Sequence, residues 1–460
     1  MPKELVSECD VGTSGTWNCC FERVPQTPQC GVLQAAHRQF RRARMVEVVA
    51  VETLVERCAG LDVDKDTVVA CVRVTTGTDV ETHLATFGTM TSELLALRDW
   101  LSGWGVTLVG MESTGVYWKP VYYVLEDAIG CWLLNARHLR NVPGRKTDMA
   151  DAAWIAQLVA NGLVNPSFVP PKEIRELRTL TRYRKAQIEE RSRQAQRLDK
   201  ILQDAGIKLS SVATDILGVS GRAMLTALVA GTSDPEVLSQ LAKGPLRVKI
   251  PMLQEALRGR FSAHHALIVA EVLAKLDDLE EAIARLTDAI DEAIAPFGHE
   301  RDLLATTPGI DKRTAEGIIA EIGADMTVFG DAAHLASWAG RCPGQYESAG
   351  KSKSGKTRKG NKWLRTYLHD AATSAVRTKG TYFGSQYVRI KGRRGHAKAL
   401  GAVQHSVLVS AFHMLDRDEP FHDLGADYFI KRHDPQRRAR RLLKELNTLG
   451  YTVTAQPPAA

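Results

Sequence analysis

The sequence lacks any apolar run long enough to cross a membrane. A spanning helix needs about 20 apolar residues, and the longest stretches here, such as Val106–Met111, have only the length of a strand. Eight cysteines in 460 residues are too few for a disulfide scaffold, and no two of them form the CxxC pair typical of a zinc site. Residues Met1–Asp10 carry three acids and no apolar signal core. These absences exclude membrane proteins and disulfide-rich secreted proteins, so we expect a multi-domain cytoplasmic protein with no membrane partner.

Positive charge is concentrated in one segment. The whole chain has a formal net charge of +7, but Lys351–Leu400 contains 14 Lys and Arg against one acid, Asp370, which leaves 46 basic and 52 acidic residues elsewhere. Such a segment is typical of a protein that binds the phosphate backbone of a nucleic acid. A solvated surface without a ligand is the alternative. The candidate DNA-binding residues are Lys351, Lys353, Lys356, Arg358, Lys359, Lys362 and Arg365.

Strands and helices are predicted to alternate between residues 57 and 168. Stretches rich in β-branched residues and short apolar runs indicate strands, and helical spacing of apolar residues indicates helices. The predicted strands cover 59–65, 67–74, 106–111 and 131–134, and the predicted helices cover 92–104, 116–127 and 147–160. We therefore expect an α/β domain over 57–168. Residues 1–56 are predicted to be a poorly ordered extension, whose four cysteines match no zinc-binding spacing.

The next segment, 169–299, is predicted to be a helical linker. Pro170-Pro171 ends the first domain, and Lys172–Lys208 has the polar, basic composition of a long exposed helix. Further on, apolar residues recur with the 3,4 spacing of a coiled-coil seam. They are Leu276, Leu279, Ile283, Leu286, Ile290, Ala293 and Phe297. Such a stripe indicates either a helical hairpin within one chain or the arm of a dimer.

Residues 300–395 predict a mostly helical C-terminal domain, and 396–460 predict a helical tail. Within the domain, Thr307-Pro308-Gly309-Ile310 separates two helical stretches and is similar to a helix–hairpin–helix turn. The amides of such a turn can face a DNA phosphate. Such a short turn is not specific for DNA binding by itself, but the basic segment that follows it also favours DNA binding.

Four acids of the α/β domain are candidate metal ligands. Asp62 lies within a predicted strand, where an inward charge is costly unless it binds a cation. Glu112 ends an apolar strand, at the edge where α/β sheets place ligands. Asp148 and Asp151 are three residues apart on a predicted helix, hence on one face. Carboxylates suit Mg²⁺, and a two-metal site can promote phosphoryl displacement. For the two helix aspartates alone, acids favoured at a helix N-terminus are the simpler explanation.

Several stretches together resemble the DEDD insertion-sequence transposases, which form the insertion-sequence-110 family of bridge-RNA-guided recombinases and are related to the Piv-type invertases. In the first domain these stretches are Gly60-Leu61-Asp62-Val63-Asp64-Lys65, Met111–Trp118 and Arg145–Ala152. In the second they are Pro308-Gly309-Ile310, Trp338-Ala339-Gly340 and Glu347-Ser348-Ala349-Gly350-Lys351, which continues to Arg365. The similarity covers about residues 58–450.

This resemblance implies a RuvC-like (ribonuclease-H-like) fold in which Asp62, Glu112, Asp148 and Asp151 hold Mg²⁺, with two ions expected. It implies that Ser348 attacks DNA and becomes covalently linked to it. The activity implied is that of a transposase or site-specific recombinase of a bacterial insertion sequence, which acts on the element ends and a target under the guidance of an RNA. We also expect a homo-oligomer, a dimer or a tetramer, associated with the nucleoid.

The chemistry of Ser348 follows from its neighbours. A serine hydroxyl is a weak nucleophile unless a base or metal activates it. The neighbours here are mostly Lys and Arg, which would instead hold the scissile phosphate, so activation would need the acids of the other domain. Two rival functions stay open: a RuvC-like junction nuclease without a covalent intermediate, and a basic coiled-coil DNA-binding protein without enzyme activity.

One further motif indicates a different ligand. Residues Gly350–Thr357 match the phosphate-loop pattern GxxxxGK[ST] letter for letter. A phosphate loop follows a buried apolar strand, whereas the residues before this motif include Pro, Gly and charged side chains. The sequence therefore disfavours ATP binding.

Overall fold

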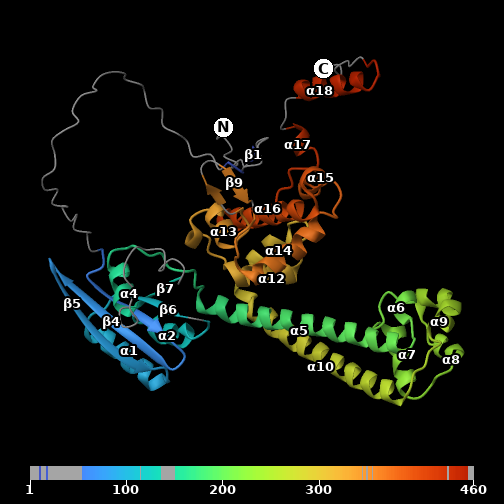
Figure 1. Cartoon of the computed structure of the whole chain (residues 1–460), viewed down its shortest axis with the longest axis horizontal. Helices are drawn as coiled ribbons and strands as arrows, with labels where there is room; N and C mark the ends of the chain where they lie inside the picture. Colours follow the sequence, from blue (N-terminus) through green and yellow to red (C-terminus); the bar gives the residue numbers. More distant parts are fainter. Residues whose placement is uncertain are drawn as a thin grey trace. The chain divides into compact units, whose positions relative to one another are not determined.

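The computed structural model describes residues 10–11, 17–18, 54–113, 115–135, 151–343, 346–348, 351–354, 356–431 and 435–453. The chain divides into two compact units, one formed by Phe21–Val169 and the other by Met1–Cys20 with Pro170–Ala460 (Figure 1). Within the predicted N-terminal extension, β1 (Asp10–Val11) pairs with β2 (Trp17–Asn18) in an antiparallel register. The four cysteines of that extension lie outside the described residues.

The first unit is built on a five-stranded mixed sheet with the order β5-β4-β3-β6-β7. The first three strands form an antiparallel meander, and β6 and β7 continue the sheet parallel to β3. The strands are β3 (Arg57–Val63), β4 (Thr67–Thr76), β5 (Asp79–Gly88), β6 (Leu108–Ser113) and β7 (Gly130–Leu133). The expected mixture of strands and helices is confirmed, and β5 is an additional strand that the sequence had not indicated.

Helices cover both faces of this sheet. On one face, α1 (Thr91–Gly103) and α2 (Trp118–Leu125) pack against alternate residues of β3, namely Ala59, Leu61 and Val63. On the other face lies α4 (Asp151–Ala160), whose Ile155, Leu158 and Val159 pack with Cys58. Burial of alternate strand residues is what a two-sided sheet requires, so the residues between those of the first face point toward α4.

From Pro170 onward, the first feature of the second unit is a long helical hairpin, here called the arm (Figure 1). Helices α5 (Lys172–Asp204) and α10 (Ala263–Ala293) pack along each other in opposite directions, as shown by the pairs Arg191–Glu280 and Arg184–Thr287. The predicted seam contributes Leu276, Leu279 and Ile290, which are buried within this one chain. Of the two arrangements left open, the structure forms the intrachain hairpin.

Between the two arm helices, short helices pack around one apolar core at the arm's tip, which includes Leu198, Leu225, Leu253 and Leu276. These elements are α6 (Leu209–Val212), α7 (Val219–Val229), α8 (Pro235–Ser239), the 3-10 helix η2 (Gly244–Lys249) and α9 (Ile250–Ala256).

After the arm, a group of helices forms the C-terminal part of the second unit. Its central element is α16 (His396–Arg417), which buries Val403, Val407 and Leu408. This helix packs against α11 (Gly298–Ala305), α13 (Ala332–Trp338), α14 (Lys362–Ala375) and α15 (Tyr382–Arg394). A boundary at residue 396, where we predicted a tail, would divide this core. The other elements are η3 (Ala295–Phe297), α12 (Lys312–Ile322), η4 (Thr327–Phe329), β8 (Tyr346–Ser348), β9 (Lys351–Ser354), α17 (Tyr428–Lys431) and α18 (Pro435–Thr448).

The predicted Pro-Gly turn joins α11 to α12 and packs against α14. Gly309 has φ = 91°, and a β-carbon there would lie 2.4 Å from the carbonyl oxygen of Ala371. Thr307 beside it is buried. The structure therefore explains this glycine by the close approach of α14, without reference to a DNA phosphate.

A buried carboxylate joins the arm to the C-terminal helices. Glu321 of α12 is completely buried and accepts two hydrogen bonds of 2.7 Å from the guanidinium of Arg182 on α5. Its Oε2 also accepts a hydrogen bond from Nδ2 of Asn361, the residue that caps α14. Paired in this way, a buried charge keeps its hydrogen bonds, and the pairing fixes α5, α12 and the start of α14 together.

Candidate active site and nucleic-acid interface

Asp62 and Glu112 lie opposite each other on neighbouring parallel strands. The register pairs Asp62 of β3 with Glu112 of β6, and two residues earlier it pairs Gly60 with Gly110. Because side chains alternate along a strand and Leu61 packs with α1 and α2, these two acids point to the face that α4 covers. Both side chains are half-buried. The two carboxylates therefore share one edge of one sheet face.

Helix α4 packs directly against two glycines of this face. A β-carbon at Gly60 would lie 2.1 Å from the carbonyl oxygen of Ala152, and one at Gly110 would lie 2.5 Å from Cγ2 of Val159. Only glycine permits such contact. The helix runs opposite to β3, since the Cys58 thiol donates to the carbonyl oxygen of Ala156. Asp151, the first residue of α4, is thus at the end nearest Asp62 and Glu112.

The structure brings three of the four predicted metal ligands to one end of this face. They are Asp62, Glu112 and Asp151, and the side chain of Asp151 is half-buried like the other two. Asp148 lies outside the described residues. Carboxylates are hard oxygen donors, which suit Mg²⁺ and not a soft metal. The type of donor therefore suits a divalent cation. Among the described residues, however, the only three potential ligands whose atoms all lie within 4.8 Å of one another belong to the arm, so these three carboxylates do not form a closed cluster by themselves.

Ser348 ends the first strand of a hairpin in the second unit. β8 and β9 are antiparallel and pair Ser348 with Lys351, and a bridge between Pro343 and Thr357 closes the base of the hairpin. We call residues 343–357 the serine hairpin. Its second strand occupies the middle of the GxxxxGK[ST] motif, and the next helix begins only at Lys362. This is not the loop-to-helix geometry of a phosphate loop. Ser348 and the three acids belong to different units.

The predicted DNA-binding cations follow Ser348 along the chain. Lys351 and Lys353 lie on β9, Lys356, Arg358 and Lys359 are exposed after it, and Lys362 and Arg365 are exposed at the start of α14. The one acid of this segment, Asp370, is paired with Lys185 of α5 at 2.9 Å. Within the described ranges, no carboxylate pairs with Arg358, Lys359, Lys362 or Arg365. These cations are available to the phosphates of a nucleic acid.

The structure also reveals residues that the sequence did not indicate. Arg341, His369 and Gln404 line a pocket together with Arg365 and Thr366. They come from three parts of the chain, and no local motif marks them. Only the packing of α14 against α16 brings them together.

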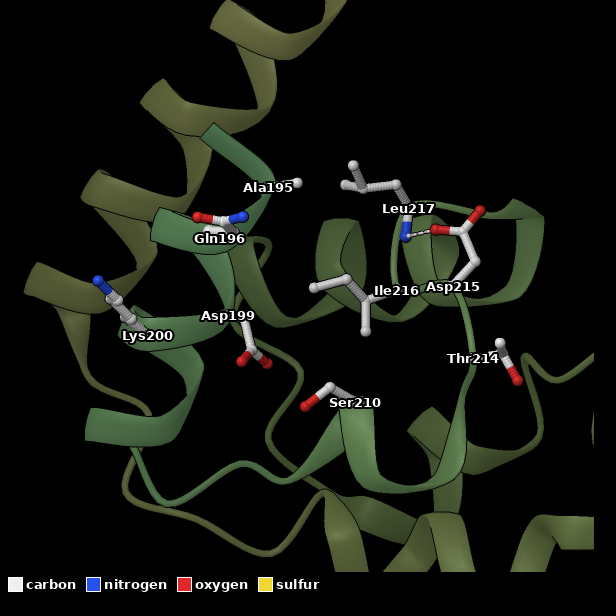
Figure 2. A pocket seen from close by; sticks show the side chains of 9 residues that line it. All are labelled: Ala195, Gln196, Asp199, Lys200, Ser210, Thr214, Asp215, Ile216 and Leu217. Atoms are coloured by element: carbon white, nitrogen blue, oxygen red, sulfur yellow. Dashed lines mark hydrogen bonds between the residues drawn. The ribbon is translucent and has the colours of Figure 1, made fainter. Parts of the chain in front are cut away.

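Two polar sites in the arm include none of the predicted site residues. A cavity of about 490 Å³ includes Asp199 and Lys200 of α5 in its wall, and there the Asp215 carboxylate accepts the amide of Leu217 at 2.9 Å (Figure 2). Asp204, His264 and His265 could offer ligand atoms within 4.8 Å of one another. However, Nδ1 of His265 accepts from the Ser262 amide and Nε2 lies 3.1 Å from Asp204. These contacts indicate a helix cap.

Two family models match the chain. One, for DEDD transposases of the IS110 type and described as Transposase, matches residues 59–207. The other, described as Transposase IS116/IS110/IS902 family, matches residues 301–388. The chain belongs to the IS110 family of transposases. No individually curated protein matches it. The first match includes the sheet and its three acids, and the second includes the serine hairpin.

As an IS110-family transposase, the protein is an enzyme of DNA transposition, and DNA is its partner. This confirms the family that the sequence motifs indicated. Among the described helices, none is long and apolar enough to cross a membrane.

Proposed function

We propose that this transposase cleaves and rejoins DNA strands by phosphoryl transfer at the element ends and a target. In this proposal Asp62, Glu112 and Asp151, with Asp148, hold Mg²⁺, and Ser348 is the nucleophile. The observation that carries it is the pairing of Asp62 with Glu112 at the face where α4 begins with Asp151. The sheet supports a ribonuclease-H-like fold, because an antiparallel meander is continued by two parallel strands.

The proposed reaction conserves the number of phosphodiester bonds. The Oγ of Ser348 forms a bond to the scissile phosphorus while the bond from phosphorus to the departing strand breaks, and the serine proton ends on the departing oxygen. In rejoining, a strand hydroxyl attacks the phosphoserine ester and Ser348 regains its proton. Bound Mg²⁺ would stabilise the charge that develops on the oxygens. Both the acids and the serine are required.

The basic segment supplies the DNA contacts in this proposal. Its cations would hold backbone phosphates and stabilise charge on the scissile one. We include a guide RNA and a homo-oligomeric assembly in the proposal. The basic composition of α5 supports a nucleic acid on the arm, and it suits RNA and DNA equally.

A denaturing gel after incubation with DNA of the element ends and Mg²⁺ tests this function. The wild-type protein should give a covalent protein–DNA adduct. Ser348→Ala should bind DNA with unchanged salt dependence and form no adduct, because its cations remain. Asp62→Asn should bind DNA and give neither adduct nor nick, because a metal ligand loses its charge. Matched controls are Ser352→Ala, Ser354→Ala and Asp64→Asn, and all three should retain the adduct.

Two results would contradict the proposal. Free nicked product without an adduct would indicate the junction nuclease, and binding with neither product would indicate a DNA-binding protein without this activity. Mass spectrometry of the adduct should locate the nucleotide on Ser348, and its location on another residue would overturn that assignment.

A further inference from the structure

A pocket of about 210 Å³ lies among the C-terminal helices of the second unit. Its wall consists of Arg341, Arg365, Thr366, His369 and Gln404. Arg341 follows α13, the next three belong to α14, and Gln404 belongs to α16. We call it the arginine pocket. It offers two guanidinium groups, a hydroxyl, an imidazole and an amide, and none of the lining residues is an acid.

Arg341 is held in this pocket as a cation without a counter-ion. Its Nη1 donates to Oε1 of Gln404 at 2.7 Å, and Nε2 of Gln404 lies 3.3 Å from Nδ1 of His369. The Nε of Arg341 is buried and has no acceptor in the described part of the chain. Burial, and then the charge of Arg365, lower the pKa of Arg341. A buried donor without an acceptor costs free energy. An anion in the pocket would accept a hydrogen bond from this Nε and so remove that cost.

Two other half-buried arginines of this unit are paired with acids. Arg182 is bonded to Glu321, and Arg313 is bonded to Asp291 and Glu316. The described residues offer no carboxylate to Arg341 or Arg365. Two neighbouring guanidinium groups without an acid are the arrangement that binds phosphate through paired N–H donors. The pocket is therefore built for an external anion and not for an internal ion pair.

The position of the arginine pocket connects it to the serine hairpin. Arg341 lies two residues before Pro343, whose bridge to Thr357 closes the hairpin. The adjoining backbone is tightly packed, because a β-carbon at Gly360 would lie 2.2 Å from the carbonyl oxygen of Ala339. Arg365 lies within the basic segment on the first turns of α14. The pocket is thus fixed to the base of the serine hairpin, whose first strand ends at Ser348.

We propose that the arginine pocket binds one phosphate of the DNA backbone and so holds the strand at the base of the serine hairpin. This rests on the proposed function only in taking DNA as the nucleic acid at this hairpin. Arg341 and Arg365 grip the non-bridging oxygens. Gln404 is a positioning residue, because it acts by orienting Arg341.

Gln404→Glu tests the proposal, because glutamate has the same shape and places a carboxylate in the pocket. The new acid pairs with Arg341, so the thermal midpoint should stay the same or rise. DNA affinity, measured in EDTA with a short duplex, should fall about tenfold, and the slope of log K against log salt should decrease by about one phosphate contact. The control Gln240→Glu adds the same charge at an exposed position of the arm and should match the wild type.

A second variant covers the case in which Gln404→Glu does not fold. Arg365 is exposed, so Arg365→Gln should fold normally and show the same loss of affinity and slope, while Arg365→Lys should recover only part of it. Wild-type affinity and slope in the folded variants would overturn the proposal. So would a loss confined to RNA of the same sequence, which would identify an RNA pocket.

The outcome is separable from that of the proposed function. Binding in EDTA does not depend on strand cleavage. If Ser348 forms its adduct but these variants bind DNA normally, the proposal of a phosphate-binding pocket is wrong and the proposed function is retained. If the variants lose affinity but no adduct maps to Ser348, the phosphate-binding role of the pocket is retained and the proposed attack by Ser348 is wrong.

Discussion

At the scale of single residues, Gly60 determines how closely α4 lies against the sheet. A β-carbon there would come within 2.5 Å of the amide nitrogen of Ala156, and backbone atoms cannot rotate away. We predict that Gly60→Ala lowers the free energy of unfolding by about 1–3 kcal/mol. It should also reduce strand cleavage, because Asp151 shifts away from Asp62. Chemical denaturation and a cleavage assay measure the two effects.

Gly103→Ala is the matched control for this substitution. Its β-carbon would meet no atom within 4 Å, so it should be neutral or slightly stabilising. Equal stability of the two alanine variants would show that the model of close helix approach is wrong.

The site residues differ in how far the sequence could predict them. Asp62 and Glu112 could be placed together because each lies on a strand of recognisable pattern, and the register does set them opposite each other. Their role as metal ligands stays a prediction. Arg341 could not be identified, because its partner Gln404 is 63 residues away. That Arg341 lies beside Gln404 and not beside an acid is decided by how α16 packs, and no sequence pattern carries that information.

At the scale of elements, the arm hairpin depends on the apolar stripe of α10. Ile290 is 1% exposed, so Ile290→Lys would bury a charge without a partner. We predict a loss of several kcal/mol in the stability of the arm, visible as faster hydrogen exchange in α5 and α10. Asp288→Lys on the same helix is exposed and should leave exchange unchanged.

Light scattering tests whether the apolar stripe of α10 forms an interface between two chains instead of packing within one chain. If Ile290→Lys keeps wild-type exchange rates but converts a dimer to a monomer, the stripe is an interface between chains.

Two elements show where sequence patterns fail. β5 escaped prediction because it is an edge strand with mostly exposed side chains, so it lacks the apolar signal of β6. The helix α16 was correctly expected as a helix. Its central place among α11, α13, α14 and α15 depends on contacts distant in sequence, so its pattern alone resembled that of a tail helix.

At the scale of the whole molecule, stability should depend on pH through α16. Burial lowers the pKa of both His405 and His413. The unfolded chain protonates these histidines near pH 6.5, about their ordinary pKa, while the folded protein keeps them neutral. The contribution of these two histidines to stability should therefore be constant above this pH and decrease as the pH falls below it. Thermal midpoints measured from neutral to mildly acidic pH test this.

The double variant His405→Gln, His413→Gln should flatten that decrease, whereas His422→Gln, at an exposed position, should not. His299 acts in the opposite direction, because its hydrogen bond with Asp418 raises its pKa. Both groups are exposed, so solvent screens this pair. A midpoint that rises on acidification would contradict the prediction.

The carboxylate of Glu321 couples movement of the arm to the start of α14. It is bonded at once to Arg182 on α5 and to Asn361 at the cap of α14, so neither helix can tilt without pulling on the other. From Arg182 to its last residue, Asp204, α5 is about 33 Å long, and a rotation of a few degrees about Arg182 moves its tip by a few ångströms. Conversely, a force applied to the tip of α5 would produce a larger force at Asn361, because the contacts through Glu321 lie close to the pivot. A nucleic acid gripped by the arm would therefore exert torque at the start of α14, directly after the serine hairpin.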